Sequence, residues 1–336
     1  MTKNKVLIIG PAWVGDMVMS QCLFKLLKQR DPEIIIDVLA PAWSVPLLAR
    51  MPEVTGSLVM PIGHGKLNLR ERYRIGKSLR EKHYQQSIVL PNSFKSALIP
   101  WWANIPVRTG FRGEMRYGVL NDIRILNQKR YPLMIEQFMA LGLPPDASLP
   151  KEYPQPELKI SPENVEQTLT KYQLTKDRPI LAICPGAEFG SAKRWPEEYY
   201  AAVANEKLRA GWQVWIFGSA NDQSVAEKIM QLTEQKCINL TGQTKLEEAV
   251  DLLSLANVVL SNDSGLMHIA ASLQKPLIAV YGPTTPTFTP PLDKKAKVLS
   301  LSLPCQPCFQ RICPLKHHRC MNDLHPQKVI DVMAEF

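Results

Sequence analysis

The feature that most constrains the fold is a repeated alternation of short apolar runs with helical patterns. In the first half, the strand-like runs "VLIIG" and "EIIIDVLA" are followed by further strands near residues 57–60 and in "QSIVLPNS". Helical patterns lie between them, near residues 15–30, 43–50 and 67–82. The runs do not alternate apolar and polar residues, so they predict a parallel sheet that helices cover on both faces.

The same alternation restarts in the second half of the chain. Five runs predict strands there: "PILAICPGA", "QVWIFGSA", "CINLTG", "NVVLSNDSG" and "PLIAVYGP". Between the halves, residues 144–162 hold too many prolines to continue a helix or a central strand, so they form a linker. We therefore predict an α/β protein with two doubly wound domains facing a cleft, in which ligands bind beyond the carboxyl ends of the strands.

The charge is distributed unequally between the two halves. The chain has 336 residues and a formal net charge of +9, and residues 1–155 carry 21 Lys and Arg against 12 Asp and Glu. The remaining residues are balanced, with 19 of each sign. A basic first half suits an anionic partner, either nucleic acid, a membrane surface or a phosphorylated substrate, although an ordinary basic surface also explains it. No recognised nucleic-acid module is present, so we expect no nucleic-acid partner.

Neither a membrane span nor a secretion signal is evident in the sequence. No apolar run approaches the ~20 residues that cross a bilayer. The first apolar run is short, and no small-residue cleavage site follows it. We therefore expect a cytoplasmic protein.

The first turn, "GPAWVGDMV", resembles a phosphate-binding loop but carries an acid. Gly10 and Gly15 have the spacing of such a loop, yet Asp16 stands where the loop needs lysine, and Ala12 breaks the dinucleotide fingerprint. At the start of a helix, the dipole favours the carboxylate by roughly 0.3–1 kcal/mol. Asp16 is thus either a fixed general base or a simple N-terminal cap.

Two later segments combine a strand end with an anion-binding helix start. In "PGAEFGSAKRWPEEYY", Lys193 and Arg194 precede a helix that begins near Pro196, an arrangement that suits a diphosphate. In "LSNDSGLMHIA", the backbone amides of Ser264 and Gly265 begin another helix. No Asp-x-Asp occurs, so helix starts and cations, rather than a carboxylate-bound metal, stabilise negative charge.

Two side chains near the second of these helix starts have competing interpretations. His268 lies one turn into that helix from Ser264, so it points toward the same ligand site. A single histidine is nevertheless often structural, and Asp263 is equally plausible as a cap.

The basic segments of the first half have two interpretations. The segment "GFRGEMRYG" contains Arg112 and Arg116, and Arg108 lies just before it. Their guanidinium groups could bind phosphates or carboxylates of an acceptor. In "GKLNLRERYRIGKSLREK", the cations instead fit a solvated helix face.

Four cysteines are clustered near the C-terminus. Cys305, Cys308, Cys313 and Cys320 have the spacing C-x2-C-x4-C-x6-C, and the opening pair is a zinc half-site, whereas the later spacings match no standard zinc module. In a cytoplasmic chain, such clustering favours metal over disulfides. A structural zinc is therefore a candidate, without a catalytic role.

Taken together, the motifs resemble the ADP-heptose:lipopolysaccharide heptosyltransferases, most closely the heptosyltransferase II branch. The matching segments are "GPAWVGDMVMSQ", "NSFKSAL", "RTGFRGEMRYG", "PGAEFGSAKRWP", "FGSAND", "NDSGLMH" and "YGPTTPTFTPP". They span nearly the whole chain in order. The resemblance implies a GT-B fold with an acceptor-binding Rossmann-like domain over 1–155 and a donor-binding one over 156–325, which includes residues 305–320. A C-terminal helix over 326–336 follows.

The resemblance also assigns roles to individual residues. It implies that Asp16 is the general base and that Lys193 contacts the donor's diphosphate. The implied donor site comprises Gly186, Lys193, Asp222, Asp263, Ser264, Gly265, Leu266 and His268, with Asp222 on the ribose. Arg108, Arg112 and Arg116 are the candidate acceptor ligands, and no cofactor is required.

The activity implied is inverting transfer of heptose from ADP-heptose to the first heptose of heptosyl-Kdo2-lipid A. The protein would then be peripheral at the cytoplasmic face of the inner membrane. The alternatives are a heptosyltransferase for another core position or a nucleotide-sugar epimerase of the same fold. A non-enzymatic basic binding protein does not explain why Lys193 and "NDSG" occur together, and a dehydrogenase lacks its fingerprint.

Overall fold

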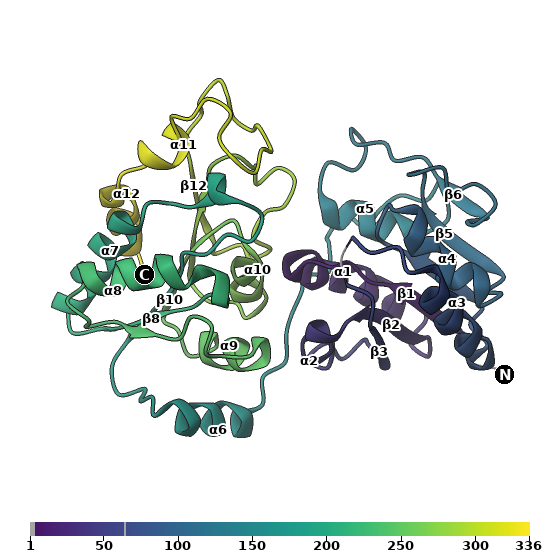
Figure 1. Cartoon of the computed structure of the whole chain (residues 1–336), viewed down its shortest axis with the longest axis horizontal. Coiled ribbons are helices and arrows are strands. Elements are labelled where there is room, and N and C mark those ends of the chain that lie inside the picture. The colour runs from purple at the N-terminus through teal and green to yellow at the C-terminus, as the bar shows by residue number, and fades with distance from the viewer. Residues whose placement is uncertain (1–3, 64) are drawn as a thin grey trace. The chain divides into compact units, whose positions relative to one another are not determined.

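The computed structural model describes residues 4–63 and 65–336. They form two compact units, unit 1 up to Pro156 and unit 2 from Glu157 to Phe336 (Figure 1). Each unit has its own six-stranded sheet and its own apolar core. All strand pairs are parallel, as the uninterrupted apolar runs predict. The α/β, GT-B type fold expected from the sequence is confirmed.

In unit 1, the strand order is β3-β2-β1-β4-β5-β6. The strands are β1 (Lys5–Ile9), β2 (Ile35–Pro41), β3 (Gly56–Met60), β4 (Gln86–Val89), β5 (Val107–Phe111) and β6 (Asp122–Arg124). The helices are α1 (Val14–Arg30), α2 (Val45–Leu48), α3 (Leu69–Ser78), α4 (Phe94–Trp102) and α5 (Met134–Leu141), with 3-10 turns at Ala42–Ser44 and Leu79–Lys82. Helix α1 packs beside α5, and α3 packs beside α4.

Unit 2 repeats this topology, with the order β12-β11-β10-β7-β8-β9. Its strands are β7 (Ile180–Cys184), β8 (Gln213–Ile216), β9 (Ile238–Asn239), β10 (Val258–Asn262), β11 (Leu277–Tyr281) and β12 (Lys297–Ser300). Its helices are α6 (Pro162–Tyr172), α7 (Glu197–Arg209), α8 (Gln223–Leu232), α9 (Leu246–Leu253), α10 (Gly265–Ser272), α11 (Arg319–Asn322) and α12 (Pro326–Met333), with 3-10 turns at Ser191–Lys193 and Ala220–Asp222. Helix α12 packs on α7 of the same unit.

The topology determines where each unit can bind a ligand. In a doubly wound sheet, the strand order reverses between two neighbouring strands, and their carboxyl ends leave a crevice. In unit 1 these strands are β1 and β4, and in unit 2 they are β7 and β10. The segments that follow these four strands contain Asp16, Lys95, Lys193 and Asp263. The fold thus brings the motifs of each half to the reversal point of its own sheet.

Three strands were not expected from the sequence. Strand β5 reads "VRTGF" and β6 has three residues, so neither forms a long apolar run. Strand β12 lies at the edge of its sheet and exposes much of its length. Strands β5 and β6 extend the unit 1 sheet beyond β4, and β12 extends the unit 2 sheet beyond β11.

Among the described residues, none of the helices combines the length and the apolar composition needed to cross a bilayer.

Candidate functional site

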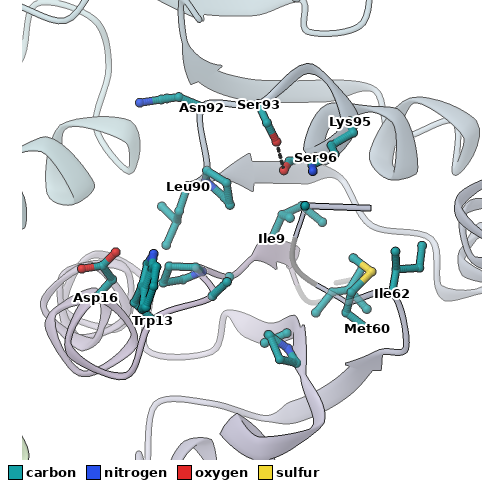
Figure 2. Close-up of a pocket in the computed structure, with 18 of the residues that line it drawn as sticks. Ile9, Trp13, Asp16, Met60, Ile62, Leu90, Asn92, Ser93, Lys95 and Ser96 are labelled. Carbon is teal, nitrogen blue, oxygen red and sulfur yellow. Dashed lines mark hydrogen bonds between the residues drawn. The ribbon is translucent and has the colours of Figure 1, made fainter. Parts of the chain in front are cut away.

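A pocket of about 990 Å³ lies at the reversal point of the unit 1 sheet (Figure 2). Its walls come from the ends of β1, β2, β3 and β4 and from the starts of α1 and α4. Asp16 and Trp13 line one side of this pocket, and Ser93, Lys95 and Ser96 line another. It therefore combines a carboxylate, a cation and an aromatic ring.

Asp16 lies in the first turn of α1 and is partly exposed. The N-cap residue of this helix is Trp13, so Asp16 is not itself the N-cap. Its carboxylate lies where the helix dipole favours the charged form. The structure therefore places a carboxylate at the wall of an open pocket rather than in the packed interior.

Lys95 is a pocket residue that sequence reasoning did not single out. It lies in the first turn of α4, where it is half-buried and lines the pocket. Its segment, "NSFKSAL", was visible as a family motif, but nothing in the sequence indicated that this strand end would lie opposite Asp16.

The structure corrects the prediction for Arg116. Arg116 is 2% exposed and donates to the carbonyls of Pro91 and Phe111 and to Oδ1 of Asn92. Arg108 is half-buried and donates to the carbonyls of Val119 and Ile105. The Arg116 guanidinium is buried among hydrogen-bond acceptors of the fold and is not available to an acceptor substrate, whereas Arg108 keeps part of its side chain exposed and stays a candidate. Arg112 is exposed.

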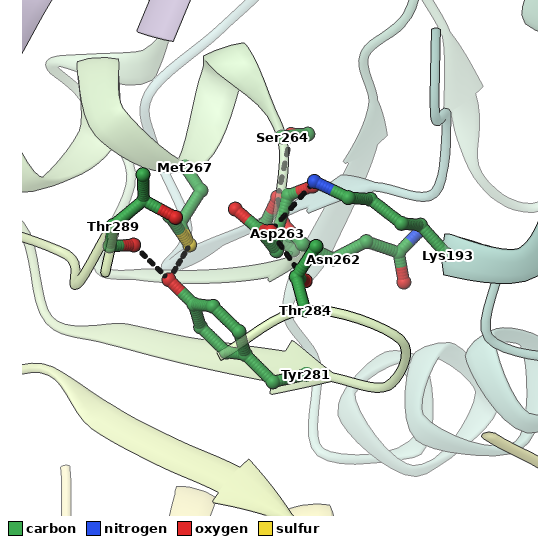
Figure 3. A network of polar contacts seen from close by, with 9 residues as sticks. Lys193, Asn262, Asp263, Ser264, Met267, Tyr281, Thr284 and Thr289 are labelled. Atoms are coloured by element: carbon green, nitrogen blue, oxygen red, sulfur yellow. Dashed lines mark hydrogen bonds and ion pairs between the residues drawn. The ribbon is translucent and has the colours of Figure 1, made fainter. Parts of the chain in front are cut away.

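In unit 2, the ends of β7 and β10 bring Lys193 and Asp263 together (Figure 3). The Nζ of Lys193 lies 2.6 Å from Oδ2 of Asp263 and 3.3 Å from the Asp263 carbonyl oxygen. The Thr284 hydroxyl donates to the same carboxylate oxygen at 2.6 Å. Asp263 is 5% exposed and the Lys193 side chain 13%. The carboxylate therefore holds the ammonium group in place at the start of α10.

The start of α10 is open to solvent. Ser264, its N-cap residue, makes no side-chain capping hydrogen bond, and its hydroxyl lies 3.2 Å from that of Ser261. Ser264, Gly265 and Leu266 are partly exposed. Helix starts with available amides attract anions, and Lys193 lies beside this one.

His268 is buried within α10, with 4% of its surface exposed. Burial lowers its pKa to about 4, although Asp263 opposes this shift, so the imidazole is neutral at pH 7. Its Nδ1 is buried without a hydrogen-bond partner. His268 therefore lies in the first turn of α10, as predicted, but its side chain is buried and neutral rather than exposed.

Asn262 joins the two strand ends, a role that its sequence context did not indicate. Its Nδ2 donates to the Pro185 carbonyl at 2.7 Å. Its Oδ1 accepts from the Tyr200 hydroxyl at 2.9 Å and from the Trp195 amide at 3.3 Å. Asn262 is fully buried, so these bonds fix the β7 and β10 loops relative to each other.

Asp222 caps its own 3-10 turn. Its Oδ2 accepts from the amide and hydroxyl of Ser219, at 2.9 and 2.8 Å, and Arg194 lies 4.0 Å from Oδ1. A Cβ on Gly186 would come within 2.4 Å of this carboxylate, so the close approach requires glycine. Gly186, in the loop that precedes Lys193, therefore packs on Asp222, in the turn that follows β8.

The structure does not support a metal at the four clustered cysteines. Among the residues described, no three His, Cys, Asp or Glu side chains are grouped so as to hold a metal ion. Cys320 belongs to the apolar core, whereas Cys305, Cys308 and Cys313 are half-exposed. Burial, together with the nearby thiols of Cys313, Cys308 and Cys305, raises the pKa of Cys320 to about 11.

Comparison with known proteins gives the family. Residues 72–319 match the glycosyltransferase family 9 (heptosyltransferase) model. The chain is 48% identical to the lipopolysaccharide heptosyltransferase 2 of Escherichia coli K12 over 97% of each chain. The chain belongs to glycosyltransferase family 9.

Two further comparisons extend this family 9 assignment. The lipooligosaccharide heptosyltransferase 2 of Haemophilus ducreyi is 50% identical over 88% of each chain. The solved structure of the Escherichia coli ADP-heptose lipopolysaccharide heptosyltransferase II matches with a TM-score of 0.89 and 46% identity, covering 98% of both chains. The two parallel sheets are thus those of a family 9 glycosyltransferase, and the resemblance found in the sequence is confirmed.

Proposed function

We propose that this enzyme transfers heptose from ADP-heptose to the first heptose of the lipopolysaccharide inner core. One observation carries the proposal. Asp16 lies at the wall of the unit 1 pocket, and the Lys193–Asp263 pair lies at the equivalent reversal point of unit 2. The names of the relatives, heptosyltransferase 2 and ADP-heptose lipopolysaccharide heptosyltransferase II, support both the donor and the position in the core.

In this proposal, unit 2 binds the donor. Lys193 and the amides at the start of α10, from Gly265 and Leu266, hold the diphosphate. The same groups stabilise the negative charge that develops on ADP as it leaves, which is the task that a metal performs in other transferases. Asp263 keeps Lys193 in position, and Asp222, at the end of the next strand, is the proposed ribose ligand.

The acceptor binds in the unit 1 pocket. Asp16 takes the proton from the acceptor hydroxyl, whose oxygen attacks the anomeric carbon of the heptose. The bond from that carbon to ADP breaks, and its electron pair leaves with ADP, so the configuration inverts. A positioned general base contributes typically ~10²–10⁴-fold to such a step. Lys95 and Arg112 offer cations to the acidic groups of the acceptor.

The proposed acceptor lies in a membrane, so we also propose that the protein acts at the cytoplasmic face of the inner membrane as a peripheral enzyme. The excess of positive charge in residues 1–155 supports this, because an anionic lipid surface attracts it. Binding to vesicles that contain the acceptor should weaken as salt is added. Binding that does not change with salt would contradict this electrostatic attraction.

A mass-spectrometric assay with defined acceptors tests the substrate. Purified protein is incubated with ADP-heptose and Kdo2-lipid A carrying no, one or two heptoses. We expect a mass gain of one heptose on the acceptor with one heptose. Transfer to another acceptor instead would assign a different position in the core. Conversion of ADP-heptose without any acceptor would point to an epimerase.

A further inference from the structure

The cysteine-rich segment of unit 2 packs against the loops of the proposed donor site. The amides of Cys308 and Phe309 donate to the Pro283 carbonyl at 3.1 and 2.8 Å. Gln306 donates to the Gly282 carbonyl at 2.7 Å. This turn leads directly to Thr284, whose hydroxyl binds the Asp263 carboxylate.

The same segment also holds the loop that carries Lys193. The Ala192 amide donates to the Arg311 carbonyl at 3.1 Å. Gly190 has a φ of +157° and packs so closely on Arg311 that a Cβ would lie 2.3 Å from the Arg311 carbonyl oxygen. The backbone of Arg311 therefore fixes the approach of this loop, independently of the Arg311 side chain.

The Arg311 side chain shares an aromatic ring with Lys193. The Arg311 guanidinium carbon lies 5.5 Å from the centroid of the Phe189 ring, and Lys193 Nζ lies 4.9 Å from the same centroid. Both cations therefore lie against one ring, and Lys193 also lies beside Asp263 at the start of α10, which is itself electropositive. Lys193 has Asp263 as its counter-charge, whereas the exposed Arg311 guanidinium forms no ion pair within the described part of the chain.

We propose that Arg311 is a second cationic ligand of the donor's diphosphate. Lys193 and Arg311 lie on the Phe189 ring, and Asp263 neutralises only Lys193. The remaining positive charge of Arg311 would be neutralised by a diphosphate. The guanidinium fork suits paired phosphate oxygens, and its exposure lets it turn toward a ligand. This inference rests on the proposed function, and it gives the cysteine-rich segment a role in donor binding.

Nucleotide binding to the purified full-length protein tests this. ADP affinity is measured by calorimetry, and adenosine affinity by competition with ADP, for wild type, Arg311→Ala and Arg311→Lys. We expect Arg311→Ala to weaken ADP binding about 10- to 100-fold and adenosine binding little. Arg311→Lys should be intermediate, because it keeps the charge without the fork. Lys316→Gln, which removes an exposed cation from the same segment, should leave both affinities unchanged.

Two results would overturn the inference. Wild-type ADP affinity in Arg311→Ala would exclude a contact with the diphosphate. An equal loss of ADP and adenosine affinity would indicate that the side chain merely supports the loop. A wild-type protein that binds no ADP would instead contradict the proposed function itself.

Discussion

The ammonium group of Lys193 lies 2.6 Å from Oδ2 of Asp263, and the two side chains lie in the segments that follow the neighbouring strands β7 and β10 of unit 2. Both are largely buried, so the pair is formed at a place where each charge alone would be poorly solvated. The Asp263 carboxylate thus binds Thr284 and Lys193 of the same unit, while the Lys193 ammonium group remains beside the open start of α10. This division of roles leads to the first two predictions.

Asp263→Ala should destabilise unit 2 by about 3 kcal/mol, because it leaves the Lys193 ammonium group buried without a counter-charge. Hydrogen exchange of the amides of β10 measures the free energy of opening of this unit. Glu234→Gln is the control, since it breaks the exposed Lys236–Glu234 pair and should change the opening energy by less than ~1 kcal/mol. Equal effects of the two substitutions would contradict the prediction.

Lys193→Gln should lower kcat/KM for ADP-heptose about 10- to 100-fold, the range expected when a charged hydrogen bond to phosphate is lost. Steady-state kinetics with a saturating acceptor measure it. Lys236→Gln, at an exposed site away from the strand ends, should behave like the wild type. Unchanged kinetics in Lys193→Gln would remove this residue from the donor site.

Asp16→Asn should reduce kcat by ~10²–10⁴-fold, because the amide cannot take the proton of the acceptor hydroxyl. ADP affinity should stay near the wild-type value, since unit 2 is unchanged. Single-turnover transfer and ADP calorimetry measure the two quantities. Wild-type turnover in this variant would exclude Asp16 as the general base.

Lys95→Met should raise KM for the acceptor about 10-fold and leave KM for ADP-heptose unchanged, because Lys95 lines the unit 1 pocket. Methionine keeps most of the length of the side chain without its charge. Lys77→Met, in the last turn of α3 and exposed, is the matched control. A rise in both KM values would indicate a general disturbance of the fold instead.

The buried imidazole of His268 should make unit 2 less stable in acid. Its pKa falls from the ordinary 6.5 to about 4 because of burial, so the unfolded chain binds the proton more readily than the folded one. The contribution of neutral His268 is therefore complete above pH 6.5 and is lost as the pH falls to about 4, by about 3 kcal/mol in all. Hydrogen exchange of α10 measures it at several pH values.

His268→Gln should remove this part of the pH dependence. His83→Gln, which alters an exposed histidine of unit 1, should preserve it. An unchanged pH dependence in His268→Gln would assign the acid sensitivity to other groups.

Local patterns were sufficient to predict the centre of each sheet. Runs such as "VLIIG" and "PILAICPGA" became the strands β1 and β7, because a segment buried on both faces must be apolar throughout. Asp16, Lys193 and Asp263 became candidates because each follows such a strand, and the resemblance to the family gave them their roles. Strands β5 and β6 were not predicted, since neither is a long apolar run and the neighbouring strand decides their pairing.

The sequence by itself determined the two doubly wound sheets, the strand ends that carry the motifs and the family to which they belong, because these depend on apolar periodicity and short spacings. Only the tertiary structure decided what the charged side chains contact. Arg116 donates to the Pro91 carbonyl of another segment, Cys320 enters the core, and Arg311 contacts Phe189, which is far from it in the sequence. The physical reason is that such partners are chosen by burial and by which polar groups remain to be satisfied, and both exist only once the chain has folded.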